Sequence, residues 1–263
     1  MPDSGVPLIE FKNVTIHREG VPALREVTFT IRAGEHTAIL GPNGSGKSTL
    51  IKAITREVYP RFAPPECRLR IWGREVWHLF DLRALLGIVT NDLVETCVKP
   101  YSALETALSG FFGSIGIWPN HHVTAGMEQK AREALEFFEV GHLAERPLTE
   151  MSSGEVRRAV FARALVHDPQ ALILDEPTNS LDIRAQREVR DAIRKLAAGG
   201  VTVILVTHHL PDIVPEIDRV ITLRAGRLHS DGAKAEALSE SSLSGLFGVD
   251  VRVTEAEGFY HLW

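Results

Sequence analysis

Nine consecutive residues near the start of the chain have the composition of a phosphate-binding loop. They are Gly41, Pro42, Asn43, Gly44, Ser45, Gly46, Lys47, Ser48 and Thr49. Glycines let backbone N–H groups converge on phosphate oxygens, lysine supplies a point charge, and the Ser48 hydroxyl is a ligand for Mg²⁺. A glycine-rich turn at a helix start is the alternative. A predicted strand at 36–40 before the loop and a predicted helix at 48–56 after it favour phosphate binding.

Two neighbouring carboxylates, Asp175 and Glu176, follow an apolar run at 171–174. The carboxyl end of a strand is the edge at which open parallel sheets bind ligands. We expect Asp175 to reach a magnesium ion through water. Glu176 is then placed to polarise an attacking water as general base, a role that is typically worth about 10²- to 10⁴-fold in rate. Acids after a strand also cap helices, but the upstream loop favours nucleotide hydrolysis.

Composition limits the remaining possibilities. The chain has 263 residues, 44% of them apolar, which suits one α/β domain with an insertion. The strongest apolar run, 201–206, has the length of a buried strand, far below the roughly 20 residues of a membrane span. Residues 1–7 do not resemble a secretion signal, so a cytoplasmic location is expected. The formal charge of −5 argues against a large nucleic-acid surface.

The two cysteines, Cys67 and Cys97, are isolated in the sequence. They have no CxxC spacing and no companion histidine cluster, so neither a disulfide framework nor a zinc site is indicated. We expect both to be inert reduced thiols.

Hydrophobic periodicity predicts the elements around these residues. Alternating residues at 8–31 predict antiparallel strands, broken at Gly20 and Pro22. Further strands are predicted at 69–72, 87–90, 171–174 and 201–207, with irregular chain at Pro60, Pro64 and Pro65. The segment 91–150 is helical in pattern, and Thr124 is its clearest N-cap. Its apolar positions recur at Met127, Ala131, Leu135 and Phe138.

These elements predict an α/β fold: a P-loop core with a parallel sheet flanked by helices, an N-terminal antiparallel β subdomain and an inserted helical subdomain. A charged helix at 183–198 between two apolar strands indicates a βαβ unit. The expected domain spans 6–245 with the insertion at about 92–166. A tail at 246–263 completes the fold.

The segment Met151, Ser152, Ser153, Gly154, Glu155 resembles the signature motif of ABC ATPases. Its S-x-x-E spacing is also that of a capping box opening a helix, and both interpretations can hold together. A capped helix N-terminus with Ser153 and Gly154 exposed would bind an anion. In the family, this motif contacts the γ-phosphate held by the opposite subunit, so the resemblance implies a head-to-tail dimer that hydrolyses Mg-ATP.

The other landmarks of that family occur in the same order. Ser180, Leu181 and Asp182 resemble the D-loop, which crosses the dimer interface. His208 resembles the switch histidine that contacts the γ-phosphate. His17 stands where the family has an aromatic residue stacked on adenine, and Asn91 stands where it has a glutamine that senses Mg²⁺. The imidazole of His17 offers less stacking area than that aromatic residue. The side chain of Asn91 is one methylene shorter than that of glutamine.

Two segments bear on the kind of ABC protein. The segment 108–118, rich in glycine and aromatics, lies where transporter members receive the coupling helix of their membrane partner; a tight helix corner packed by Phe111 and Phe112 is the alternative. It resembles a subfamily of ATP-binding proteins related to molybdate-import ATPases. The segment 243–250 resembles the end of importer ATPases for metal chelates and vitamins, and a closing helix and hairpin is the alternative.

The leading hypothesis is therefore the ATPase subunit of a transporter, paired with a second ATPase subunit and with a permease on another chain. The rival is a soluble ABC ATPase acting on nucleic acid or another macromolecule. A small-molecule kinase is disfavoured, because it has no use for the signature segment or for His208.

Overall fold

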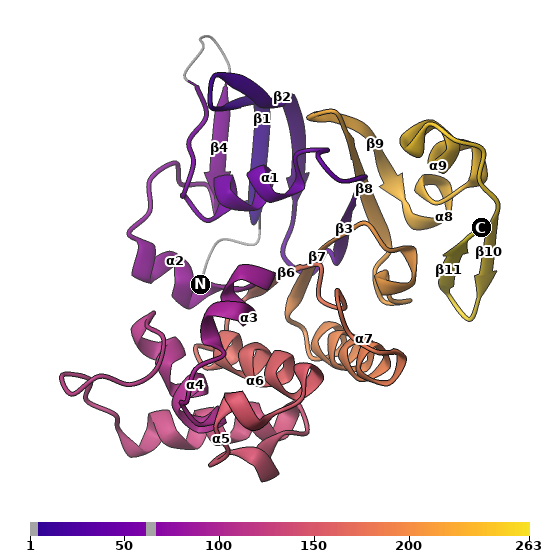
Figure 1. The fold of residues 1–263 in the computed structure, drawn as a ribbon. Helices are drawn as coiled ribbons and strands as arrows, with labels where there is room; N and C mark the ends of the chain where they lie inside the picture. Colours follow the sequence, from indigo (N-terminus) through magenta and orange to yellow (C-terminus); the bar gives the residue numbers. More distant parts are fainter. Residues whose placement is uncertain (1–4, 62–66) are drawn as a thin grey trace. The chain divides into compact units, whose positions relative to one another are not determined.

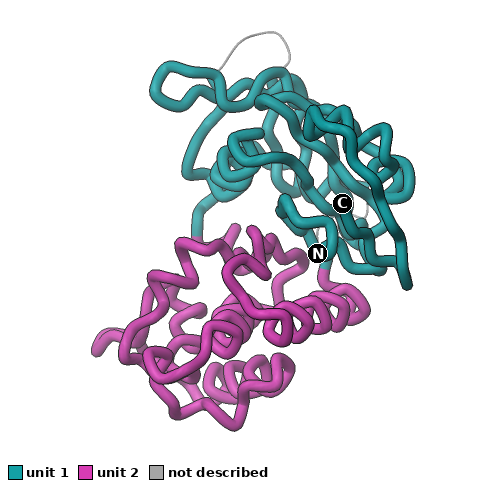
Figure 2. The backbone as a smooth tube through the Cα atoms, turned by 45° about the vertical axis from the view of Figure 1, so that its right-hand side comes forward, with its two compact units in different colours: residues 1–79, 202–263 teal, residues 80–201 magenta. Residues whose placement is uncertain are grey.

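The computed structural model describes residues 5–61 and 67–263. Two compact units make up the chain: unit 1 contains residues 1–79 and 202–263, and unit 2 contains residues 80–201 (Figure 2). Pro64 and Pro65, expected in irregular chain, lie outside the described residues. Among the described residues, no helix is long and apolar enough to cross a bilayer.

Unit 1 begins with the predicted antiparallel sheet. Strand β1 (Ile9–Arg18) lies between β2 (Val21–Ile31) and β4 (Arg68–Ile71), and both pairings are antiparallel (Figure 1). The hairpin turn has left-handed backbone at Glu19 and Gly20, with φ of 51° and 81°. Two left-handed residues match the twist of the flanking strands, as in the favoured two-residue hairpin turns. The alternating pattern therefore predicted this subdomain correctly.

The second sheet of unit 1 carries the core. Strands β7 (Thr202–Thr207), β3 (Thr37–Leu40) and β8 (Arg219–Arg224) run parallel in that order, and β9 (Arg227–Ala233) pairs antiparallel with β8. Every residue of β3 and β7 is buried. Continuous apolar strands of this kind are covered on both faces. Helix α1 (Lys47–Ile54) follows β3 across the glycine-rich loop.

The tail also belongs to unit 1. It contains α8 (Lys234–Ala237), α9 (Glu240–Phe247) and a hairpin of β10 (Val253–Ala256) and β11 (Phe259–Leu262). Strand β11 lies against the short helix η4 (Leu210–Asp212), which comes soon after β7. The closing helix and hairpin predicted for this segment are present.

Unit 2 contains two parallel strands and most of the helices. Strand β5 (Leu86–Val89) pairs with β6 (Ala171–Asp175). The helices of this unit are α2 (Leu79–Leu85, which starts at the unit boundary), α3 (Asn91–Cys97), α4 (Ala103–Ser109), η1 (Gly110–Phe112), α5 (Ala125–Phe137), η2 (Gly141–Leu143), η3 (Leu148–Glu150), α6 (Ser153–Leu165) and α7 (Ile183–Ala198).

Helices α4, α5 and α6 pack on one another. The Thr124 side chain caps α5 by accepting a hydrogen bond from the Met127 amide at 3.2 Å, as predicted. The rings of Phe138 and Phe161 meet edge to face with centroids 5.5 Å apart. The predicted helical segment thus exists with its own apolar core. Unit 2 also includes β5, β6 and α7, and the expected domain bounds of 6–245 and 246–263 stay a prediction.

The two cysteines are free thiols, and Cys97 is buried. Burial raises the pKa of the Cys97 thiol. A raised pKa leaves less of the reactive thiolate, which agrees with the inert role expected for this residue.

Candidate functional site

The glycine-rich loop of unit 1 is shaped by its glycines. Gly44 and Gly46 have φ of 77° and 107°, in the left-handed region that favours glycine. A Cβ atom on Gly46 would lie 2.7 Å from a methyl carbon of Leu24 and 2.9 Å from the Ala23 carbonyl oxygen. The backbone therefore approaches β2 too closely for any side chain. The same backbone turns the chain from β3 into α1.

Lys47 directs its ammonium into this loop. Nζ donates to the carbonyl oxygens of Gly41 at 2.7 Å and Pro42 at 3.3 Å, and the residue is 7% exposed. Ser48 is exposed on the first turn of α1. A charged lysine and a helix N-terminus at one loop form a local positive field suited to phosphate oxygens.

Strand pairing in unit 1 places His208 near this loop. Leu40 and Thr207 are paired across β3 and β7, so Gly41 and His208 each follow the carboxyl end of neighbouring strands. The rings of His208 and His209 lie with centroids 3.8 Å apart. His17, the expected adenine-stacking residue, is half-buried in β1 opposite Pro22.

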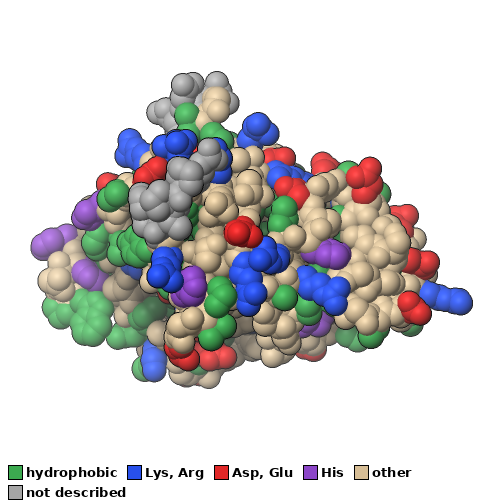
Figure 3. Space-filling view, turned by 90° about the horizontal axis from the view of Figure 1, so that it is seen from above, with side chains coloured by type: hydrophobic (Ala, Val, Ile, Leu, Met, Phe, Trp, Pro, Cys, Tyr) green, Lys and Arg blue, Asp and Glu red, His purple; other side chains and the backbone are tan. Residues whose placement is uncertain are grey.

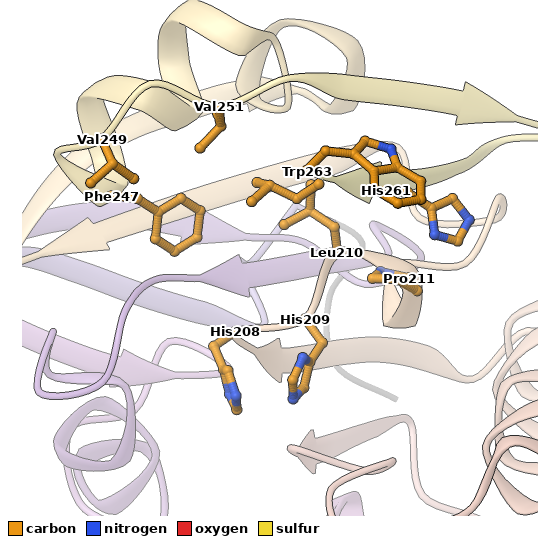
Figure 4. A pocket seen from close by; sticks show the side chains of 10 residues that line it. His208, His209, Leu210, Pro211, Phe247, Val249, Val251, His261 and Trp263 are labelled. Carbon is orange, nitrogen blue, oxygen red and sulfur yellow. The ribbon is translucent and has the colours of Figure 1, made fainter.

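A cavity of about 630 Å³ lies beside the two histidines. Its lining is mostly apolar and includes Leu210 of η4 and Phe247, Val251 and Trp263 of the tail (Figure 4). The tail thus packs around the segment that follows His208.

The pairing in unit 2 brings a second set of predicted residues together. Val89 and Leu174 are partners across β5 and β6, so Asn91 follows the end of β5 while Asp175 ends β6 and Glu176 follows it. Glu176 has φ of 49°, a left-handed conformation that is unusual for a glutamate. The turn that follows is closed by the Asn179 amide, which donates to the Glu176 carbonyl at 3.1 Å.

The signature segment opens α6 through a capping box. The Ser152 hydroxyl accepts from the Glu155 amide at 3.4 Å, and the Glu155 carboxylate accepts from the Ser152 amide at 2.8 Å. The hydrogen bond from the Ser152 backbone lowers the pKa of Glu155. Ser153 is exposed at the first residue of the helix. The capping box that the spacing predicted is therefore present.

The expectation that Gly154 is exposed is wrong. Gly154 is buried, and a Cβ atom there would lie 2.8 Å from the Cβ of Ala185 in α7. Close packing of α6 on α7 therefore requires glycine at this position. The exposed side chains at the start of α6 are therefore those of Ser152 and Ser153, and a role for them in binding an anion stays a prediction.

The D-loop residues connect β6 to α7. Ser180 has φ of 61°, Leu181 is buried, and the Asp182 carboxylate caps α7 by accepting from the Ala185 amide at 2.8 Å. Within the chain, Asp182 therefore acts as an N-cap. Its expected role across a dimer interface stays a prediction.

Asn91 has a partner that the sequence did not indicate. Its Oδ1 accepts from both terminal nitrogens of Arg157, each at 3.0 Å. Arg157 lies on α6 and is 6% exposed. It also donates to the carbonyl oxygens of Glu176 at 3.1 Å and Asn179 at 3.3 Å. The available signal in the sequence was an arginine two positions after the signature segment. The sequence pattern does not show, however, which residue a single buried arginine in a helix will bind.

The predicted metal ligands fit magnesium in their chemistry. Ser48, Asp175 and Asn91 offer a hydroxyl, a carboxylate and an amide oxygen, and Mg²⁺ prefers hard oxygen ligands. Asn91 Oδ1 is engaged by two charged donors, so a metal bond from this oxygen competes with Arg157.

A glycine-rich loop with a buried lysine, an acidic pair at a strand end and a capped signature helix define an ATP-hydrolysing P-loop protein of the ABC class. Comparison with known proteins agrees. The family described as ABC transporter matches residues 24–179. The chain belongs to this ABC transporter family, as an ATP-hydrolysing subunit.

Three relatives illustrate the similarity. The hemin import ATP-binding protein HmuV of Bradyrhizobium diazoefficiens is 32% identical over 266 residues, covering 95% of this chain and 92% of that protein. The structure of cbiO1 from Clostridium perfringens, part of the transporter complex cbiONQ, has a TM-score of 0.76 at 28% identity and covers 90% and 93% of the two chains. A dimeric ATP-binding cassette in a post-hydrolysis state with ADP and phosphate has a TM-score of 0.68 at 27% identity, covering 86% and 98%.

Proposed function

We propose that this chain powers a membrane importer by binding and hydrolysing Mg-ATP as a head-to-tail dimer. The observation that carries this proposal is the exposed, capped start of α6, where Ser152 and Ser153 stand at a helix N-terminus. A helix N-terminus with exposed hydroxyls attracts a phosphate. In this arrangement, the signature helix of one subunit closes over the γ-phosphate bound by the loop of the other.

Different residues of this chain have different roles in hydrolysis. Lys47 and the amides of the loop hold the β- and γ-phosphates, and His17 lies against the adenine. Ser48 and, through water, Asp175 would hold Mg²⁺, and the ion would supply neutralisation of charge on the phosphate oxygens. Glu176 accepts a proton from water as the water oxygen attacks the γ-phosphorus. The bond between that phosphorus and the bridging oxygen breaks, which leaves ADP and phosphate, while His208 holds the γ-phosphate in line.

The permease docks on the corner between α4 and α5. The Phe112 ring stacks on His121 with centroids 4.1 Å apart, and the nearby Trp118 is 53% exposed. Two glycines fix the corner: a Cβ atom on Gly110 would collide with the Arg163 carbonyl, and one on Gly116 would collide with the ring of Tyr101. The tight corner is present, and the proposal takes its exposed side at Trp118 as the docking surface. Docking places this chain at the cytoplasmic face of a membrane.

Cargo of the metal-chelate class fits the relatives, since one is named for hemin import. The rival, action on nucleic acid, predicts a continuous basic surface. On the face shown in Figure 3, basic and acidic side chains are interspersed. This favours the transporter subunit.

Substituting Glu176 by Gln tests the proposed base and the dimer together. Without the carboxylate, the proton of the attacking water has no acceptor, so ATP turnover should fall about 10²- to 10⁴-fold. ATP should then hold the protein as a dimer, measured by size-exclusion chromatography with light scattering. Lys47→Ala in the same protein is the control and should restore the monomer. Rapid turnover by the Gln variant would refute the base assignment.

The partner is tested with the same trapped protein. Glu176→Gln, purified by affinity from detergent-solubilised native membranes with Mg-ATP, should carry a polytopic membrane protein that mass spectrometry identifies. Trp118→Ala in this background should release it. Recovery of only soluble chains or nucleic acid would favour the rival function.

A further inference from the structure

One buried guanidinium links two segments of unit 2 to helix α6. Arg157 donates to the Asn91 side chain, to the Glu176 carbonyl and to the Asn179 carbonyl, at distances between 3.0 and 3.3 Å. Asn91 follows β5, Glu176 follows β6, and Asn179 precedes the D-loop. A planar fork of N–H donors can bind several acceptors at once, whereas a lysine ammonium is a point charge. Arg157 therefore ties these segments to α6 by side-chain geometry.

The two carbonyls that Arg157 holds lie at the ends of a strained turn. Glu176 itself and Ser180, directly after Asn179, have φ of 49° and 61°. Non-glycine residues persist in this conformation only where the surrounding structure fixes them. Backbone bonds fix part of the turn, from the Asn179 amide to Glu176 and from the Leu181 amide to Thr178. Arg157 adds a charged donor at each end.

We propose that Arg157 is a positioning residue for ATP hydrolysis, which holds the backbone of Glu176 and the D-loop and couples both to Asn91. The proposal rests on the proposed role of Glu176 as base. The Asn91 side chain and the two carbonyls bind the same rigid guanidinium. A shift of Asn91 therefore moves the guanidinium, and the guanidinium moves the turn that carries the base. Arg157 acts through the backbone carbonyls that it holds, so its proposed effect on the reaction passes through Glu176.

A second arginine on α6 provides a control that distinguishes a positioning role from a purely structural one. Arg163 lies on the same helix and donates to Ser109 Oγ at 3.2 Å and to the Ser114 carbonyl at 3.0 Å. Burial lowers its pKa. Arg163 is therefore a second hydrogen-bonded arginine of α6, half-buried, and its acceptors are not the proposed catalytic residues. Replacing either arginine disturbs the fold, but only Arg157 should affect the reaction specifically.

The kinetic test compares Arg157→Gln, Arg157→Lys and Arg163→Gln. We expect kcat of Arg157→Gln to fall about 30-fold, because a base displaced by about 1 Å loses rate on the order of 10²-fold. Arg157→Lys should keep part of the kcat that Arg157→Gln loses. In these variants, the ATP concentration at half-saturation should change less than about threefold. Arg163→Gln should lose thermal stability but keep kcat, per folded protein, within about threefold. Equal kcat for the two Gln variants would overturn the proposal.

A double-mutant cycle tests the link to Asn91. Residues in one hydrogen-bond network have non-additive effects. Asn91→Ala should therefore lower kcat less in the Arg157→Gln background than in the unmodified protein, and additive losses would contradict the coupling.

Hydrogen exchange gives a readout that needs neither nucleotide nor metal. In the ligand-free protein, the amides of Asn179 and Leu181 should exchange at least about tenfold faster in Arg157→Lys, since the strained turn opens more often. Arg163→Gln should leave them unchanged. Unchanged exchange in Arg157→Lys would overturn the proposal. If instead Glu176→Gln keeps its turnover while the exchange result holds, the base assignment fails and the role of Arg157 in holding the turn stands.

Discussion

At the scale of single residues, several side chains carry two roles. Ser152 caps its helix and stands at the proposed phosphate contact, and Asp182 caps α7 within the proposed D-loop. Lys47 is held by loop carbonyls at the point where phosphate oxygens are expected to lie. A fold-stabilising contact therefore does not argue against a functional one, and variants must be assessed for stability and activity separately.

His167 makes stability depend on pH. Burial lowers its pKa below the ordinary value of 6.5, and its Nε2 lies 3.2 Å from the Gly110 carbonyl. Below pH 6.5, the unfolded chain binds a proton that the native state resists, so the free energy of unfolding should fall as pH drops from 6.5 towards 5. Burial of His36 acts in the same direction.

Urea unfolding between pH 5 and 7.5 measures this effect. His167→Gln keeps a donor for the Gly110 carbonyl but does not titrate. The free energy of unfolding of this variant should therefore depend less steeply on pH than that of the unmodified protein, and the difference in slope should correspond to less than one bound proton. His122→Gln, at an exposed position, is the control and should follow the unmodified protein. A His167→Gln curve parallel to the unmodified one would contradict this account.

At the scale of elements, two capping boxes in unit 2 form a matched pair. Ser102 with Glu105 opens α4, and Ser152 with Glu155 opens α6. Replacing either serine by alanine should lower stability by about 1 kcal/mol, the usual cost of a lost cap. Only Ser152→Ala should also lose ATP turnover, by about tenfold, because one hydrogen bond to a charged phosphate is worth about 1.5 kcal/mol or more.

Thermal denaturation and steady-state ATPase assays of the two variants give the comparison. Equal losses of turnover in the two variants would show that Ser152 affects ATPase activity through its helix cap alone and not through a phosphate contact.

The elements also show what sequence can predict. The strands of the N-terminal sheet, β3, β5, β6 and β7, the loop after β3 and the caps of α5 and α6 were predicted because each depends on residues close together in the chain, whereas β8 and β9 were not predicted. The exposure of Gly154 was predicted wrongly because it depends on α7, whose Ala185 packs against it. Arg157 was missed for the same reason: its acceptor Asn91 lies 66 positions away. The catalytic roles themselves stay predictions, since they depend on ATP and on a second subunit as well as on this chain.

At the scale of the whole molecule, the proposed dimer predicts complementation. Lys47 and Ser153 belong to different subunits at each composite site. A mixture of Lys47→Ala and Ser153→Glu proteins should regain up to about a quarter of normal ATPase activity, because at most half of the dimers are mixed and each mixed dimer has one intact site.

Mixing Lys47→Ala with Glu176→Gln is the control. Both residues serve the site of their own subunit, so every mixed dimer has two damaged sites and no recovery is expected. Recovery in the control, or none in the test mixture, would contradict the head-to-tail arrangement.

The contact between Arg157 and Asn91 also constrains how this chain can diverge. The two positions share one hydrogen-bonded pair within unit 2, so a substitution at one changes which residues natural selection accepts at the other. A longer amide at position 91 would meet the guanidinium, and a shorter side chain at 157 would leave the asparagine without its donor. Lineages descended from a common ancestor should therefore keep or replace the two residues together.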